Sequence, residues 1–108
     1  MILFLLLLLG AQGDPVPKDL PSAARCTALF GSMLDQLRQK SGDPTMTKAF
    51  EEDIVALRNI VVAERRNAPD PQAAAEAVIA AERRTIQGPA EGMDLKPCYR
   101  VKALGPLG

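Results

Sequence analysis

The chain of 108 residues contains no histidine and no tryptophan, a single tyrosine, three phenylalanines and only two cysteines. Without histidine it lacks the usual general base, the commonest metal ligand and the one side chain that ordinarily titrates between pH 5 and 8. Catalytic triads and dyads that depend on histidine are therefore excluded. The sequence also has no glycine-rich phosphate loop, no calcium-binding loop and no haem attachment motif. We expect no catalytic residue, no metal site and no cofactor.

Neither sign of charge is in excess. The chain has 13 basic and 13 acidic residues, which gives a formal net charge of zero at pH 7. A balanced chain exerts no long-range attraction on polyanions, so we predict no nucleic-acid partner.

The only long apolar run lies at the start of the chain, at residues 2–9. Eight helical residues rise about 12 Å, much less than the ~30 Å hydrocarbon core of a membrane. Small residues follow at Ala11 and Gly13, as at a signal-peptidase site. We predict that residues 1–13 are a secretory signal cleaved before Asp14, and that the mature protein is periplasmic or secreted without a stable membrane span. No Lys or Arg precedes the run, which leaves open an uncleaved interfacial anchor or an incomplete start.

Export out of the reducing cytosol favours a structural disulfide between Cys26 and Cys98. Such a bond closes a loop of about 73 residues and stabilises the fold by roughly 4 kcal/mol in the chain-entropy model. Redox cysteine pairs are commonly two residues apart and zinc sites need about four ligands, so neither use fits this spacing well. A free or reactive thiol remains the alternative.

Three segments have the apolar periodicity and the start signals of helices. Ser22 precedes the first stripe, and an aspartate followed by proline, at Asp43 and again at Asp70, begins the second and third. The predicted helices cover residues 22–40, 44–66 and 71–87. Because the connections are short, sequential helices should be antiparallel, which predicts an all-α, up-down-up three-helix bundle.

Residues 88–102 contain Gly88, Pro89, Gly92 and Pro97, which favour an extended strap over a fourth helix. The strap has to return about 21 Å along the bundle to reach Cys26, and eleven extended residues can span about 35 Å. The predicted organisation is a mobile Pro-rich lead at 14–21, one helical domain at 22–102 whose strap is tied back by the disulfide, and a disordered tail at 103–108.

The sequence Ala-Glu-Arg-Arg occurs twice, ending in Arg65-Arg66 and in Arg83-Arg84. These arginines are possible contacts for an anion or an acidic partner. In the predicted bundle the two pairs lie about 18 Å apart along the helices and cannot share one small anion. Arg83 and Arg84 are instead expected near the acidic run at 51–53, in cross-helix ion pairs of small net value. Three consecutive carboxylates fan out over about 200° of a helix, so they cannot converge on one reacting atom.

Together these patterns predict a non-enzymatic binding or structural module of the periplasm or exterior, which holds a protein partner of the cell envelope. The groove between strap and helices, or an exposed helix face, would form the contact, and the protein would be a monomer or weak homodimer. The alternative is an acid- or envelope-stress holdase chaperone that exposes its apolar stripes. With no histidine, its switch would be carboxylate protonation well below pH 5.

Overall fold

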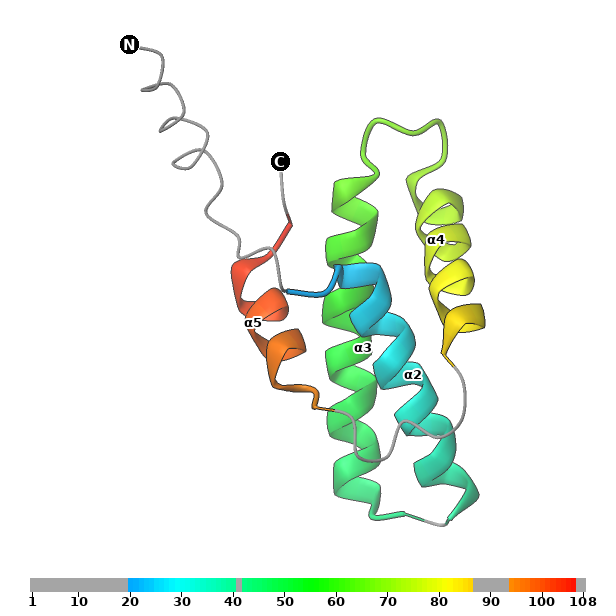
Figure 1. The fold of residues 1–108 in the computed structure, drawn as a ribbon, viewed down its shortest axis with the longest axis vertical. Coiled ribbons are helices and arrows are strands. Elements are labelled where there is room, and N and C mark those ends of the chain that lie inside the picture. The colour runs from blue at the N-terminus through cyan, green and yellow to red at the C-terminus, as the bar shows by residue number, and fades with distance from the viewer. Residues whose placement is uncertain (1–19, 41, 87–93, 107–108) are drawn as a thin grey trace, which may run out of the picture.

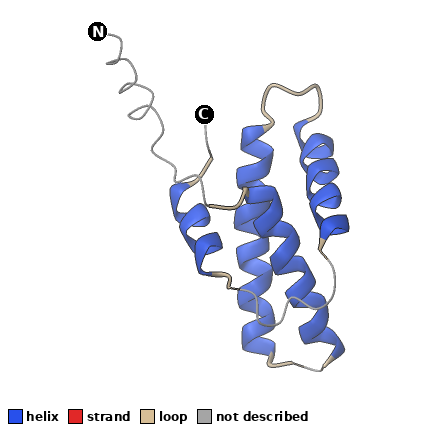
Figure 2. Ribbon diagram, in the orientation of Figure 1, coloured by secondary structure: helices blue, strands red, loops and turns tan. Residues whose placement is uncertain are grey.

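The computed structural model describes residues 20–40, 42–86 and 94–106, and within them every regular element is a helix (Figure 2). With the labels of Figure 1, the helices are α2 (Ala23–Gln39), α3 (Pro44–Glu64), α4 (Pro71–Thr85) and α5 (Lys96–Leu104). The predicted signal and nearly all of the Pro-rich lead lie outside the described residues. None of the helices within the described ranges is both long enough and apolar enough to cross a bilayer.

The starts of the first three helices follow from local capping. The Ser22 side chain accepts a hydrogen bond from the N–H of Arg25 and so satisfies a free donor at the start of α2. Asp43 and Asp70 do the same for α3 and α4, each with proline at the first helical position, where its missing N–H costs nothing. All three predicted starts are confirmed to within a residue. The second and third helices each end two residues earlier than predicted, and the first ends one residue earlier.

Helices α2 and α3 form the centre of the arrangement, because they pack against each other and each packs against both α4 and α5. Helices α4 and α5 each contact α2 and α3 and lie on opposite flanks of that pair (Figure 1). A helix with neighbours on three sides must be apolar nearly all round. Accordingly, residues 23–30 of α2 are buried with the single exception of Arg25, which is half-buried.

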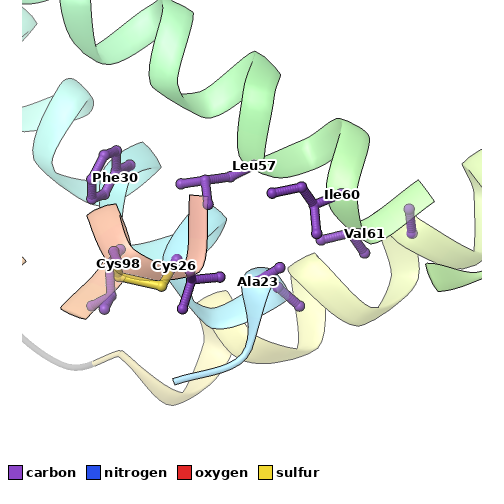
Figure 3. Packing of buried hydrophobic residues seen from close by; sticks show 11 residues of the cluster. Ala23, Cys26, Phe30, Leu57, Ile60, Val61 and Cys98 are labelled. Carbon is purple, nitrogen blue, oxygen red and sulfur yellow. A yellow bond between two sulfur atoms is a disulfide. The ribbon is translucent and has the colours of Figure 1, made fainter. Parts of the chain in front are cut away.

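The core combines side chains from all four helices (Figure 3). Helix α2 contributes Phe30 and α3 contributes Leu57 and Val61, which are fully buried. From α4 the only buried side chain is Ala75, whose small size lets that helix approach closely. On the other flank, Cys98 of α5 forms the predicted disulfide with Cys26 of α2.

Helix α5 corrects the prediction of an extended strap at 88–102. Residues 87–93 lie outside the described residues, but Lys96–Leu104 form a helix of nine residues. Pro97 does not prevent it, because it lies in the first turn, where the amide hydrogen has no helical acceptor. The Asp94 side chain accepts a hydrogen bond from the N–H of Lys96 and so helps this turn to begin.

The prediction of a disordered tail at 103–108 is wrong for its first two residues. Ala103 and Leu104 are the last turn of α5, and the helix ends at Gly105. Gly105 has a φ of 77°, a conformation that glycine adopts without steric cost. Its N–H donates to the Val101 carbonyl at 3.1 Å.

Candidate functional site

An open pocket lies where the chain leads into α2 and where α5 ends. Its volume is about 360 Å³, including space that is open to solvent. The wall is mainly apolar, with one hydroxyl and one carboxylate, and consists of Leu20, Pro21, Ser22, Ala23, Glu64, Val101, Leu104 and Gly105. Ala23 and Val101 also belong to the core, whereas Leu104 is 52% exposed. This hollow, the α5 pocket, therefore connects the core with the surface.

Two helix ends shape the α5 pocket. On one side Ser22 is the N-cap of α2, and its oxygen is already engaged by the N–H of Arg25 at 3.0 Å. On the other side Gly105 turns the chain away from α5 and leaves Leu104 at the edge of the hollow. The pocket exists because α2 begins and α5 ends here, whereas α3 continues past both as far as Glu64 (Figure 1).

The Cys26–Cys98 disulfide holds α5 beside this pocket. The two Cα atoms are 5.5 Å apart, within the range of unstrained disulfides. Both residues are almost fully buried, at 0% and 1% exposed. Thiol–disulfide exchange needs direct attack on a sulfur atom, which this packing prevents. The bond is thus placed to stabilise the fold, and redox exchange would first require α5 to separate from α2.

Three aromatic rings connect α5 with the other helices. Phe30 lies edge-on to Phe50 of α3 and to Tyr99 of α5, with ring centroids 5.4 and 5.5 Å apart. Such pairs add roughly 0.5–1.5 kcal/mol beyond their buried area. Phe30 is fully buried, but Tyr99 is 46% exposed and presents part of its ring to solvent.

A polar cluster joins α5 to α3. The Lys102 ammonium lies 2.6 Å from Asp53 Oδ1, and the same carboxylate acts on the pKa of the nearby Tyr99 hydroxyl. Asp53 is the most buried of the charged side chains in the ion pairs, at 13% exposed. Burial, followed by the Asp53 charge and hydrogen bond, raises the pKa of Tyr99. The hydrogen bond to Asp53 is also the main reason why the pKa of Lys102 is raised.

Five ion pairs within the described residues join one helix to another. They are Arg25–Glu82, Arg38–Glu51, Arg58–Glu76, Arg83–Asp35 and Lys102–Asp53. Most of these side chains are between about a third and a half exposed, so each pair contributes about 0–1 kcal/mol. Their main effect is on specificity, because together they set the register of each helix pair.

The four candidate arginines do not form one site. Arg83 binds Asp35 of α2 at 2.5 Å, so the predicted pairing of Arg83 with residues 51–53 was wrong. The physical reason is that α4 packs closely on α2 as well as on α3, which brings the α2 carboxylate nearer. Arg66 donates to the Ala63 carbonyl at the end of α3. Arg65 and Arg84 are exposed at opposite ends of the α3–α4 hairpin, and their role as anion or partner contacts stays a prediction.

The sequence prediction did not identify Leu104 or Lys102 as site residues. Leu104 was assigned to the tail, since nothing local marks a nine-residue helix that ends in Ala-Leu-Gly. Lys102 lies 49 positions from Asp53, and only the packing of α5 on α3 brings the two together. Across residues 20–40, 42–86 and 94–106, no three cysteine, aspartate or glutamate side chains are grouped as metal ligands.

Comparisons with protein-family models, curated proteins and solved structures find no match for this chain. Any functional interpretation therefore depends on the geometry of the chain itself.

Proposed function

We propose that this chain is a small, non-enzymatic binding module that holds a protein partner at the α5 pocket. The observation that carries the proposal is Leu104, half-exposed at the edge of an apolar hollow that continues into the core through Ala23 and Val101. A single exposed leucine is ordinary on a protein surface. An exposed leucine beside a concave apolar wall provides a place where one apolar side chain of a partner loses its contact with water.

The size and polarity of the α5 pocket favour this interpretation over binding of a metabolite. Small-molecule pockets are commonly 300–1,000 Å³ and enclose most of the ligand. Here about 360 Å³ includes the part that is open to solvent, so the enclosed part suits a single side chain. The polar groups in the wall do not form a nucleophile with a base, because Ser22 is engaged as a helix cap and the other group is Glu64.

Site-specific photo-crosslinking in cells of the encoding organism tests the proposal. A photoreactive amino acid is placed at Leu104 and, as a matched control, at Val55, which is 58% exposed on α3 and lies outside the pocket wall. The expected result is one discrete adduct from position 104 and none from position 55. Equal labelling from both positions would contradict the proposal. So would a chemical turnover that copurifies with the protein and is lost in Glu51→Gln or Arg84→Gln.

We further propose that the module acts in the periplasm or exterior, with residues 1–13 as the signal, as a monomer or weak homodimer. The disulfide supports this location, since such bonds persist mainly outside the reducing cytosol. A sizeable share of the domain's stability would then depend on oxidation after export.

A second candidate, the acid-loosened holdase, is favoured by the ion pairs. Each of the five ion pairs described above joins two helices through a carboxylate, so acid removes the negative charge of each pair. Five pairs at about 0–1 kcal/mol each amount to a few kcal/mol, a sizeable part of a small domain's stability. Binding of a hydrophobic dye and protection of a denatured client protein below about pH 3 would support it. A rigid fold that binds no dye at pH 2 would exclude it.

A further inference from the structure

The solvent-facing side of α5 carries a regular stripe that ends at the α5 pocket. Lys96, Arg100 and Leu104 follow one another at four-residue spacing, so they lie on one side of the helix at intervals of about 6 Å. All three are exposed, as is Tyr99 beside them. We name these four residues the α5 stripe. Along the helix toward the pocket it presents Lys96, the Tyr99 ring, Arg100 and then the apolar anchor Leu104.

Within the described residues, the charges of this stripe are not used in ion pairs. Five carboxylates are used in the ion pairs between helices, and Asp43, Asp70 and Asp94 accept N–H groups at helix starts. Among the described residues, neither Lys96 nor Arg100 has an ion-pair partner.

Resting on the proposed function, we infer that the partner of the α5 pocket is an acidic protein segment. It lies along the α5 stripe with carboxylates opposite Lys96 and Arg100 and one apolar side chain in the pocket beside Leu104. A helix with the pattern acidic-x-x-x-acidic-x-x-x-apolar has the matching 6 Å repeat. Tyrosine and arginine are the residues that most often dominate such contacts, and the stripe offers one of each.

A membrane surface fits these observations less well than a protein segment does. Interfacial helices insert a broad apolar face into the lipid. In α5 the buried residues are Cys98 and Val101, whose side chains are part of the core, and Tyr99 is packed in part against Phe30. Only Leu104 and the free edge of Tyr99 remain for contact, which is enough for one anchor and too little for insertion.

The test uses the chain recovered from an export-competent host with its disulfide intact. The probe is a dye-labelled, alanine-rich peptide of about 15 residues, the length at which such helices become populated, with Glu, Glu and Leu at four-residue spacing. Binding is followed by fluorescence anisotropy, and its location by amide chemical shifts. The reference peptides replace both Glu by Gln, or Leu by Ser. Vesicles of phosphatidylglycerol with phosphatidylcholine test the membrane alternative.

We expect shift changes confined to α5 and the pocket wall, and binding that weakens with salt. Lys96→Ser with Arg100→Ser should weaken binding about tenfold, as expected when two exposed charge contacts are lost. The matched pair Lys48→Ser with Arg84→Ser removes the same charge from α3 and α4 and should change it less than twofold. Unfolding midpoints of both variants verify that the fold is retained.

Three results would overturn the inference: equal weakening by the two double variants, equal binding of the Glu and Gln peptides, or binding to the vesicles without binding to the peptide. None of them touches the proposed function, which depends on the Leu104 crosslink. Conversely, loss of that crosslink with intact peptide binding would refute the partner-holding function and leave the charge preference of the stripe standing.

Discussion

The Lys102 ammonium lies 2.6 Å from the Asp53 carboxylate and joins the last turn of α5 to the middle of α3. The two side chains differ in burial, at 40% exposed for Lys102 and 13% for Asp53. This asymmetry decides what each substitution costs. A buried carboxylate that loses its cation is not solvated by water in exchange, so the fold is destabilised. An exposed ammonium that loses its carboxylate is solvated by water and costs less free energy.

Lys102→Met is therefore expected to destabilise the fold more than Asp53→Asn. The first leaves a nearly buried charge with Tyr99 as its remaining partner in the cluster, at a cost of about 1–3 kcal/mol. The second removes the charge but keeps an oxygen that can accept from Tyr99, at a cost of about 1 kcal/mol. Urea unfolding of both single variants and of the double variant measures the difference and the coupling. Equal costs would contradict the role assigned to burial.

Alkaline pH should weaken the attachment of α5. The pKa values of Tyr99 and Lys102 are raised above their ordinary values of 10.0 and 10.5. A group whose pKa is higher in the folded state binds its proton more tightly there, so its contribution to stability is complete below the unfolded value and is lost as pH rises through the folded value. The melting temperature should therefore fall above about pH 10. Tyr99→Phe keeps the ring and removes one titration, so its profile should be flatter, and an identical profile would contradict this account.

Removal of the disulfide should cost a large share of the stability. Cys26 and Cys98 are 72 positions apart, and Cys26→Ala with Cys98→Ala is expected to lose about 4 kcal/mol in the chain-entropy model. Amide exchange of α5 should accelerate before that of α2 and α3. In the native protein, a reductant added without denaturant should act slowly, because both sulfurs are buried. Rapid reduction under native conditions would show that α5 opens readily.

Gly31→Ala should stabilise α2. Alanine is better than glycine in a helix interior by about 0.8–1.0 kcal/mol. The new Cβ would come within 3.1 Å of the Arg83 guanidinium, the mobile end of a flexible side chain, which can move at the expense of its exposed pair with Asp35. Gly42→Ala is the matched control: its Cβ would meet the Leu37 carbonyl oxygen at 3.0 Å, so this variant should lose stability. Thermal melting distinguishes the two, and a loss in Gly31→Ala would contradict the argument.

The proposed export leads to a prediction about mass. Protein recovered from an export-competent host should begin at Asp14 and weigh two hydrogens less than its reduced form. Intact-mass measurement with and without reductant and alkylation tests both points at once. A full-length chain with two alkylatable thiols would overturn the predicted cleavage and location.

Much of the helical framework could be read from the sequence because its signals are local. Ser22 and the aspartate–proline pairs at 43–44 and 70–71 cap helices through hydrogen bonds that reach only two or three residues along the chain. The pairing of Cys26 with Cys98 could also be predicted, since two cysteines in one chain allow only one intramolecular bond. The candidate site could not be predicted in this way, because its walls come from three helices.

What the sequence determined by itself is the helical class, the helix starts and the identity of the cross-link. Only the tertiary structure decided that residues 96–104 are a helix, because nine residues are too few for a helix to be stable alone. Its stability comes from Val101 in the core, from the disulfide and from the bond between Lys102 and Asp53. The disulfide and the Lys102–Asp53 bond each join residues that are 49 or more positions apart in the sequence. The same packing decided that Leu104 lies at a pocket instead of in a tail, since an apolar residue acquires that role only from the surfaces around it.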